Sequence, residues 1–449
     1  MASTYLSRTF GSPTNNKIWT MSTWLKRGSS SAEEFLFSSS ASYREFLRFE
    51  STGEFTYRKA SGSSTFEIKT NRKFLDTNSW YHFVVAVDTT QSTDTNKYKL
   101  YVNGVQETSF ATASYMSTDY TPQFNGSHIH TIGRDSENSS GFWLGSMSHF
   151  HFCDGTQLAP TVFGSTDNTT GEWNINTSPS FTLGNNGFSI LKDGDTITDQ
   201  SSNSNAWTTA GGVVTKTEDN PSNNFATMNF IMPTGGGFTS QSSTFSNGNT
   251  QFATNNSSSN YGVGLSSLGM NVGKYYAECK LISGGQGLIG IRGWQGTSSN
   301  NYLGDTPKDY RMYTNGRVYR NDGNVLDTSV SYTTNDIIGV FVDCDNWKVY
   351  WSKNGTMMNT TGLTIGNVLT DTNARSLGAY FFGCCEWNSS GNGTWQWNFG
   401  NGAFGSTQLT GTTYDGSDGQ GIFKYNPKNL TLDSTTKSFK ALCTKGLNS

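Results

Sequence analysis

The feature that most constrains the fold is the segment 335–355, in which apolar and aromatic stretches alternate with turn residues. A polar start precedes the apolar stretch 337–342, and an Asp-Asn pair separates it from the aromatic stretch 347–351. The segment closes on Asn354-Gly355. β-Branched and aromatic residues are typical of strands, and Asn-Gly is a strong signal for a tight hairpin turn. The segment therefore predicts an antiparallel β-hairpin.

The rest of the composition extends this prediction to the whole chain. At 449 residues the chain is too long for one ordinary sandwich, so two or three domains are expected. Aromatic residues make up 14% and indicate packed cores, while 50 glycines supply turns. The net charge is only -3, with no block of like charge, which argues against a nucleic-acid partner. No apolar run approaches the length of a membrane span, so membrane insertion is not expected.

Strand patterns with period two mark a first domain. Residues 17–26 alternate apolar and polar side chains, and 80–88 and 98–105 follow as clear strands. The order of the phrases SWYHFVVAVD, KLYVNGV, HTIGR and FWLGSMSHFHF resembles the laminin-G-like, concanavalin A-like sandwich family. The resemblance implies that residues 1–165 form one such sandwich.

The hairpin segment belongs to a second resemblance. Its wording is similar to the SPRY (B30.2) family, as are the strand phrases KYYAECKL at 274–281, LIGIR at 288–292 and WQWNFG at 395–400. Ala277 stands where that family usually has Trp. SPRY domains are β-sandwiches that bind partners through loops and perform no chemistry. The resemblance therefore implies a recognition domain over residues 226–405.

The expected architecture is all-β, with two antiparallel, jelly-roll-like sandwiches. A polar connector with short β elements spans 166–225, and a short C-terminal tail spans 406–449. We expect 1–165 and 226–405 to fold as separate units. Two phrases, DNPSNNFATMN at 219–229 and FKALCTKGL at 439–447, resemble phrases of virion proteins from marine tailed bacteriophages.

Glycan hydrolysis would need two carboxylates about 5–5.5 Å apart in a retaining enzyme. The laminarinase-type pattern Glu-x-Asp-x-x-Glu is absent from the sequence. Glu33-Glu34 and Glu218-Asp219 are adjacent pairs, whose side chains diverge on a strand. We therefore predict a protein that is not an enzyme and has no catalytic residues, although carboxylates from distant strands could still meet.

Metal ligands are restricted to one pattern. His128, His130, His149 and His151 form two His-x-His pairs, each of which would share one face of a strand. A four-histidine site is conceivable, but we favour strand faces without metal. Laminin-G-like domains often bind calcium through an Asp at the position that Ser148 occupies here, which argues against calcium at that position. Asp135, Asp154 and Asp167 remain possible calcium ligands, and no other cofactor is expected.

Aromatic residues in the loops of the second sandwich are the candidate binding residues. Sugar rings stack on Trp and Tyr faces, while polar neighbours bind their hydroxyls. Packing beneath loops is the alternative for each of them. The candidates are Trp294, Tyr302, Tyr310, Tyr313 and Trp387.

Together these features predict a non-enzymatic surface protein of a phage virion, in a tail fibre, receptor-binding or head-fibre role. It would recognise a host cell-surface glycan or another virion protein and associate with further copies of itself. The N-terminus lacks a signal-peptide pattern, so synthesis in the host cytoplasm and a place on the virion surface are expected. A purely structural capsid-decoration protein is the alternative, and a glycan depolymerase is the third.

Overall fold

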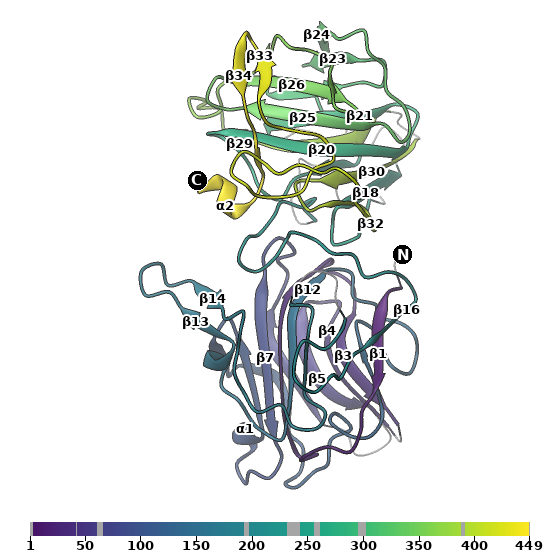
Figure 1. Ribbon diagram of the computed structural model, residues 1–449, viewed down its shortest axis with the longest axis vertical. Coiled ribbons are helices and arrows are strands. Elements are labelled where there is room, and N and C mark those ends of the chain that lie inside the picture. Colours follow the sequence, from purple (N-terminus) through teal and green to yellow (C-terminus); the bar gives the residue numbers. More distant parts are fainter. Residues whose placement is uncertain are drawn as a thin grey trace. The chain divides into compact units, whose positions relative to one another are not determined.

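The computed structural model describes residues 3–41, 43–60, 66–192, 197–230, 243–255, 261–294, 302–387 and 391–448. The chain forms two compact units (Figure 1). The first unit comprises Met1–Val214 with Asn220–Ser222, and the second comprises Thr215–Asp219 with Asn223–Ser449. In the described part of each unit nearly all of the regular secondary structure is strand, so the predicted all-β class is confirmed. No helix in the described part of the chain is long and apolar enough to cross a membrane.

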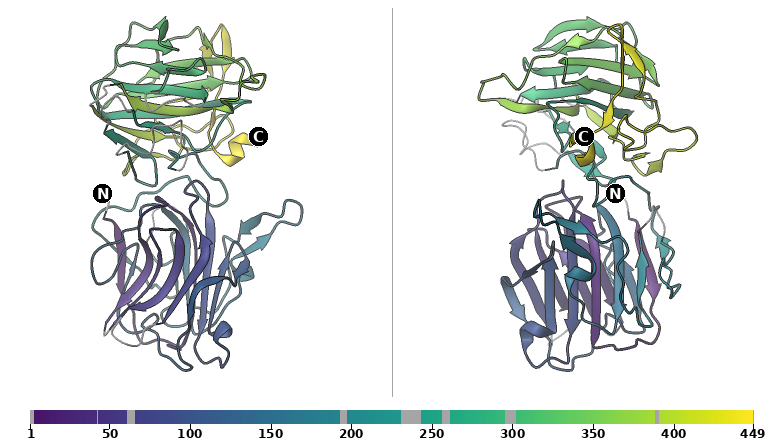
Figure 2. Two further views of the ribbon diagram at one scale, coloured as in Figure 1. Left: turned by 180° about the vertical axis from the view of Figure 1, so that it is seen from behind. Right: turned by 60° about the vertical axis from the view of Figure 1, so that its left-hand side comes forward.

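The first unit is a sandwich of two antiparallel sheets. Among the described residues, the larger sheet has eight strands in the order β10-β6-β5-β4-β3-β11-β1-β16, and its strands are visibly curved (Figure 2). Their bounds are Phe110–Ser114, Glu67–Lys73, Glu54–Ala60, Arg44–Phe49, Glu34–Ser40, Ile129–Ile132, Tyr5–Thr9 and Thr208–Ala210. The smaller sheet, likewise counted on described residues, has six strands in the order β15-β12-β2-β7-β8-β9. Their bounds are Phe188–Ile190, Ser146–Asp154, Ile18–Lys26, Tyr81–Asp88, Tyr98–Val102 and Val105–Glu107.

Alternation along the strands places the core between these sheets. On β7, Phe83, Val85 and Val87 point into the core, whereas His82 and Val84 face outward. The outward residues are buried as well. A covering segment of short elements packs on this outer face, as shown by Trp173, whose indole N–H donates to His82 Nδ1 over 3.0 Å. The short elements of the covering segment are η1 (Pro160–Val162), β13 (Gly164–Thr166) and β14 (Trp173–Ile175), while α1 (Asp94–Lys97) lies in the connection between β7 and β8.

The first unit extends beyond the boundary at residue 165 that the sequence suggested. In the predicted connector, β15 pairs with β12 and β16 pairs with β1, each adding an edge strand to a sheet. Trp207 is 3% exposed and joins the core rings of Phe10 and Phe188. The sequence predicted short β elements in 166–225 but not that they extend the sheets of the first unit, because these strands are only three residues long and most of their neighbours form turns.

The second unit is also a two-sheet sandwich. Within the described residues, one sheet has nine strands, seven of them in the order β17-β18-β30-β20-β25-β26-β27, with β28 on β26 and β35 on β20. The bounds are Thr244–Ser246, Gln251–Asn255, Asn392–Asn398, Lys274–Ser283, Ile337–Asp343, Lys348–Lys353, Thr356–Met357, Leu363–Thr364 and Lys440–Ala441. The facing sheet of this unit has six described strands in the order β19-β29-β21-β22-β23-β24. The bounds are Val263–Leu265, Ser376–Glu386, Gly287–Trp294, Asp309–Met312, Arg317–Arg320 and Gly323–Asp327.

The hairpin that the sequence predicted most strongly is present. Strands β25 and β26 pair in antiparallel register, with Val342 opposite Val349. Asn354 and Gly355 both adopt positive φ, 47° and 82°, and connect β26 to β27 as a two-residue turn. Asn103 and Gly104 turn β8 into β9 in the same way, with φ of 48° and 78°. Positive φ at both positions is what a type I′ turn requires, which explains the Asn-Gly pairs.

The tail 406–449 is an integral part of the second unit. It contains β32 (Thr407–Gln408), which pairs with β31 (Ala403–Phe404) just before the tail. It also contains β33 (Leu430–Leu432) with β34 (Thr435–Lys437), β35, and α2 (Thr444–Leu447). It covers the outer face of the nine-stranded sheet, where Phe439 contacts Phe341 with ring centroids 5.1 Å apart. Glu278 on β20 accepts the backbone N–H groups of Lys424 and Tyr425 over 3.0 and 2.8 Å. The tail therefore closes the sandwich.

The two phrases that resemble phage virion proteins lie together in this closure. Phe225 forms an antiparallel bridge with Cys443. The Ala226 N–H donates to Leu442 O over 2.9 Å, and the Thr444 N–H donates to Asn224 O over the same distance. Backbone hydrogen bonds thus join a segment near the start of the second unit to the segment near its end.

Candidate functional site

Three of the five predicted aromatic residues gather around one arginine. The aromatic–arginine cluster consists of Arg311, Tyr302, Tyr313, Tyr319 and Trp387. It lies on the outer face of the six-stranded sheet of the second unit. Strand β22 creates this arrangement because alternate side chains point to opposite faces, so that Tyr310 and Met312 enter the core while Arg311 points outward.

The guanidinium of Arg311 is enclosed by aromatic rings. Its Cζ lies 4.5 Å from the Tyr302 ring centroid, 5.2 Å from those of Tyr313 and Trp387, and 5.4 Å from that of Tyr319. These distances are within the range of cation–π attraction. Arg311 is only 1% exposed, whereas the four rings are half-buried. The buried guanidinium therefore contacts all four rings and stabilises their positions.

Hydrogen bonds fix the same group. Arg311 donates to the carbonyl oxygen of Leu303 over 3.0 Å and to Oδ1 of Asp322 over 3.0 Å. Tyr302 donates its hydroxyl hydrogen to the same Asp322 oxygen over 2.6 Å, and burial together with this bond raises the pKa of Tyr302. The side chain of Asp322 is 60% exposed. A carboxylate accessible to solvent thus stands beside the rings.

The rings continue beyond the arginine. Tyr261 stacks on Trp387 with centroids 6.1 Å apart and meets Tyr302 edge-on at 5.1 Å. Beneath them lies an apolar layer of buried side chains from β19, β21, β29 and the segment before β22. Its members are Val263, Leu265, Leu288, Leu303 and Cys385. The rings therefore rest on a rigid apolar base and present their remaining exposed edges and faces to solvent.

Two of the predicted residues lie elsewhere. Tyr310 is 1% exposed in the core, and its hydroxyl accepts a hydrogen bond from the Gly366 N–H over 3.1 Å, so its predicted place on the rim was wrong. Trp294 ends β21 and donates its indole N–H to Asp371. Among the described residues Trp294 makes no ring contact with the cluster. The sequence reasoning missed Arg311, Tyr319, Tyr261 and Asp322, although the alternation around Arg311 could have revealed its outward position.

The four histidines do not form a metal site. His130 on β11 points into the core of the first unit and stacks on Phe10 with ring centroids 3.8 Å apart. His149 and His151 belong to β12 in the other sheet, and His151 packs on the covering segment against Phe163. No group of three or more His, Cys, Asp or Glu among the described residues is placed to hold a metal ion.

The carboxylate of Asp154, at the end of β12, has its hydrogen-bonding capacity satisfied by the protein. Both oxygens of Asp154 accept hydrogen bonds, from the backbone N–H groups of Thr14, Asn15 and Asn186 and from the Asn125 side chain. Asp154 is 2% exposed and fastens the loop that precedes β2 to β12. Its environment of N–H donors suits a structural carboxylate rather than a calcium ligand.

Buried glutamates in both units also have structural partners. Burial raises the pKa of Glu45 to about 7, while hydrogen bonds from Tyr120, Tyr57 and the Phe124 N–H oppose that rise. Burial likewise raises the pKa of Glu278 to about 7. A raised carboxyl pKa is typical of a general acid, but both side chains are 0% exposed and cannot reach a substrate. All six cysteines are buried and unpaired.

The chain matches one protein family and is similar to several solved structures. Residues 2–163 match the Laminin_G_3 family, described as the concanavalin A-like lectin/glucanases superfamily, which confirms the predicted concanavalin A-like domain. No curated protein matches the chain. Among solved structures, the chain is similar to the SPRY domain of human HERC1, with 16% identity over 36% of this chain and 90% of that one and a TM-score of 0.27.

Two further solved structures show similar values. A human SPRY domain is 15% identical over 33% of this chain and 89% of that one, with a TM-score of 0.25. The native heptameric SAP-like pentraxin from Limulus polyphemus is 16% identical over 35% of this chain and 71% of that one, also with a TM-score of 0.25.

Proposed function

We propose that the protein is a non-enzymatic recognition protein whose aromatic–arginine cluster binds a glycan on a host cell surface. The observation that carries this proposal is the set of half-buried rings held around Arg311 beside the exposed carboxylate of Asp322. Ring faces suit the C–H faces of sugars, and a carboxylate accepts hydrogen bonds from sugar hydroxyls. The concanavalin A-like fold of the first unit is compatible with carbohydrate or protein binding.

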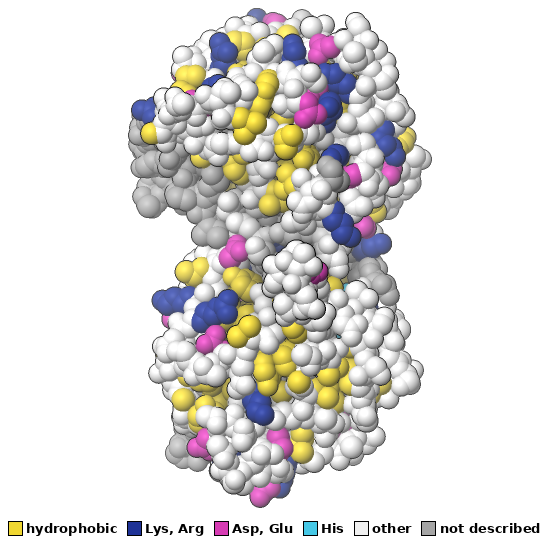
Figure 3. Space-filling view, turned by 90° about the vertical axis from the view of Figure 1, so that its left-hand side faces the viewer, with side chains coloured by type: hydrophobic (Ala, Val, Ile, Leu, Met, Phe, Trp, Pro, Cys, Tyr) yellow, Lys and Arg dark blue, Asp and Glu magenta, His cyan; other side chains and the backbone are white. Residues whose placement is uncertain are grey.

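The setting that we propose is the surface of a tailed-phage virion, in a tail-fibre or head-fibre role. Its support is the resemblance of residues 219–229 and 439–447 to virion proteins. Other virion proteins and further copies of the chain would be its partners, and it would reach the virion after synthesis in the host cytoplasm. Few charged side chains lie on the face drawn in Figure 3, so as far as its described residues go this face carries no continuous basic patch.

Substitution of the central ring tests the site. Trp387→Ala in the full chain is expected to weaken binding to the susceptible host's surface polysaccharide about 5- to 10-fold, because one ring contact contributes about 1 kcal/mol. Trp387→Phe should recover part of that loss, since it keeps a ring. Binding is measured by biolayer interferometry on immobilised polysaccharide, with the melting temperature recorded for each variant.

Trp294→Ala is the matched control, because Trp294 is half-buried but outside the cluster. It should leave the affinity unchanged. Equal losses in both Ala variants, or no loss in either, would refute the proposed site. If the full chain does not bind host cells or polysaccharide at all, the protein is the structural capsid-decoration alternative. Release of reducing ends from the polysaccharide would instead establish the depolymerase.

A further inference from the structure

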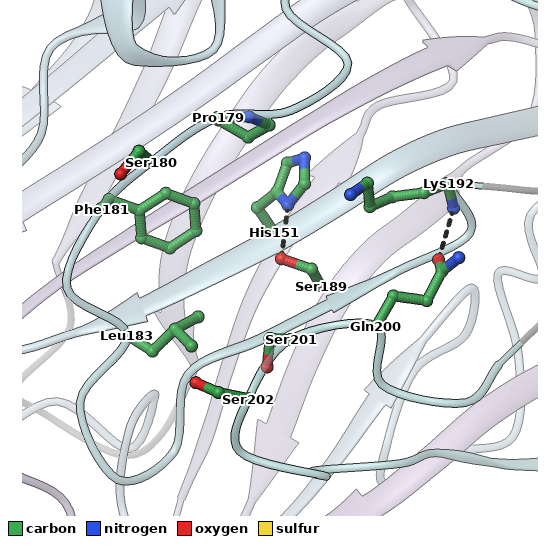
Figure 4. A pocket seen from close by; sticks show the side chains of 10 residues that line it. All are labelled: His151, Pro179, Ser180, Phe181, Leu183, Ser189, Lys192, Gln200, Ser201 and Ser202. Atoms are coloured by element: carbon green, nitrogen blue, oxygen red, sulfur yellow. Dashed lines mark hydrogen bonds between the residues drawn. The ribbon is translucent and has the colours of Figure 1, made fainter.

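The first unit has a separate polar hollow of about 240 Å³ on the side of β12 that faces away from the core. It lies between β12, β15 and the two segments 179–183 and 200–202 (Figure 4). Serine hydroxyls, an amide, an imidazole and an ammonium group line it, with Phe181 as the main apolar side chain. The residues that line it include His151, Phe181, Ser189, Lys192, Ser201 and Ser202.

The imidazole of His151 forms the floor of the hollow. His151 is 2% exposed, and its Nδ1 lies 2.8 Å from Ser189 Oγ. The ring stacks on Phe163, with centroids 5.7 Å apart, and meets the edge of Phe181 at 5.9 Å. Figure 4 shows the second ring nitrogen, Nε2, turned away from Ser189, and no described residue forms a hydrogen bond with it. A nearly buried polar atom is thus available to a bound molecule.

The imidazole is also electrically neutral. Burial, and then the positive charges of His149 and Lys192, hold the pKa of His151 well below its usual value. A neutral imidazole offers one donor and one acceptor, which suits hydroxyl groups. Lys192 lines the same hollow as His151.

Lys192 supplies a positive charge that has no counter-charge among the residues that the structure describes. Among the described residues, no carboxylate lines the hollow and none forms an ion pair with the Lys192 ammonium. Its backbone N–H is fixed by Gln200 Oε1 over 3.0 Å, as Figure 4 shows. The side chain is half-buried, so its charge acts on a space from which part of the solvent is excluded. Such a cation attracts a carboxylate.

The wall opposite is rigid because a buried aspartate ties it together. Asp199 accepts hydrogen bonds from the backbone N–H groups of Ser189 and Ser201 over 2.8 and 2.9 Å, and from the Ser201 hydroxyl over 2.8 Å. Asp199 does not itself line the hollow. Burial lowers the pKa of Arg8, and the negative charge of Asp199 opposes part of that effect, so Arg8 is an electrostatic partner of Asp199. The serine oxygens are therefore held in fixed positions.

We propose that this hollow binds one carboxylate-bearing sugar residue, a hexuronic acid. The carboxylate would contact Lys192, the sugar hydroxyls would contact His151 Nε2 and the hydroxyls of Ser201 and Ser202, and a C–H face would lie on Phe181. The volume is below the about 300–1,000 Å³ of pockets for drug-sized ligands, which fits a single ring. This proposal concerns the first unit and does not depend on the aromatic–arginine cluster.

Titration of the full chain with sodium glucuronate, glucose and sodium acetate tests the proposal by calorimetry. Glucuronate should bind with a Kd in the millimolar range, and glucose and acetate should each bind at least tenfold more weakly, because each offers only part of the complementary groups. Lys192→Met should weaken glucuronate binding at least tenfold, whereas Lys192→Arg should keep most of it. Lys99→Met, which removes a charge from the same sheet but outside the hollow, is the control and should not change binding.

Each other result counts against the hollow as a uronate site. Equal binding of acetate would mean that only an anion is recognised, and equal binding of glucose would mean that Lys192 is not used. An unchanged affinity in Lys192→Met would place binding elsewhere. Melting temperatures are measured in parallel, and because the Lys192 ammonium has no described partner, Lys192→Met should melt with the parent protein.

Discussion

Removing residues 406–449 from the full chain is expected to abolish cooperative unfolding of the second unit while the first unit still unfolds cooperatively. The tail contributes buried side chains to both faces of the nine-stranded sheet. Leu442 enters the main core, and Phe423, Leu432 and Phe439 cover Tyr276, Phe341 and Tyr350 on the outer face. Burying one large apolar side chain stabilises by about 1.5–3 kcal/mol. Four such losses amount to roughly 6–12 kcal/mol, which is comparable to the whole stability of a domain, about 5–15 kcal/mol.

Polar groups add to the loss. Without the tail, Glu278 loses two backbone N–H donors, and Asp343 loses the Lys437 ammonium, which lies 2.8 Å away. Both carboxylates are 0% exposed in the intact chain. A buried charge left without its partners is strongly destabilising. The sequence suggested that residues 226–405 fold alone. With these contacts to the tail in view, we expect that they do not.

Differential scanning calorimetry of chains 1–449 and 1–405 measures the effect. Phe439→Ala in the full chain is the point-variant test and should cost the second unit about 3–5 kcal/mol. Leu369→Ala removes a large apolar side chain that is 59% exposed, so it should change stability by less than about 0.5 kcal/mol. Two cooperative transitions in chain 1–405, unchanged from the parent, would show that the tail is dispensable.

The strand-level predictions from the sequence were accurate where local rules decide the outcome. The β25–β26 hairpin and the turn at Asn354-Gly355 depend on residues adjacent in the chain, so propensity and turn chemistry were sufficient. The domain limits depend on pairings across large sequence separations. Strand β35 pairs with β20 in parallel, and β16 pairs with β1, although each pair lies more than 150 residues apart in the sequence. These pairings depend on the tertiary fold and not on local propensity.

The phage-like phrases illustrate the same point. Residues 219–229 and 439–447 were recognised separately, as wording, and nothing in either phrase predicts a contact with the other. In the structure they form one closure, through the Phe225–Cys443 bridge and the hydrogen bond from Ala226 to Leu442. Their unusual wording is therefore explained by a shared structural role, because together they join the start and the end of the second unit.

Candidate site residues followed a similar division. Of the five aromatic residues predicted from the sequence, Tyr302, Tyr313 and Trp387 gather in one cluster, and their role in binding stays a prediction. The predicted position of Tyr310 at the binding rim was wrong because neighbouring residues of β22 point to opposite faces of the sheet. Arg311, which organises the rings, was overlooked because an arginine in a strand is usually solvated. Its role depends on four rings from separate segments, which only the tertiary fold brings together.

Acidification from pH 7 to pH 4.5 is expected to destabilise the first unit and stabilise the second. All five histidines lie in the first unit. Burial lowers the pKa of His82 and of His130 to about 3, and it also lowers that of His151. Below pH 6.5 these histidines bind protons in the unfolded chain but not in the folded unit. The free energy of unfolding of the first unit therefore decreases as the pH falls.

The magnitudes decide which effect dominates. Each of the three histidines costs about 1.4 kcal/mol per pH unit below 6.5, so together they cost about 8 kcal/mol at pH 4.5. Glu45 acts in the opposite direction, since burial raises its pKa to about 7 and the folded state takes up its proton first. That uptake returns about 3 kcal/mol by pH 4.5. Glu34, whose pKa burial also raises, offsets a further part of the loss.

The second unit has no histidine and responds through its carboxyl groups. Carboxyls with a lowered pKa, such as Asp345 and Asp433, lose their stabilising effect mainly below pH 4.5, so the buried acids dominate between pH 7 and pH 4.5. Burial raises the pKa of Glu278 to about 7 and that of Asp305 to about 6, so protonation in the folded state stabilises this unit by about 3 kcal/mol or more between pH 7 and pH 4.5. At 2–4 °C per kcal/mol, the Tm of the first transition should fall by about 10 °C and that of the second should rise by about 6–12 °C.

Calorimetry of the full chain at several pH values follows both transitions, and His130→Phe identifies the groups responsible. The new ring can keep the stacking on Phe10 but cannot be protonated. The stability advantage of this variant should therefore grow by about 1.4 kcal/mol for each pH unit below 6.5, in the first transition only. Parallel shifts of both transitions, or a constant effect of His130→Phe at every pH, would show that buried neutral histidines do not control the acid response. If the melting temperature of the first transition falls and that of the second does not, the buried neutral histidines of the first sandwich account for its sensitivity to acid.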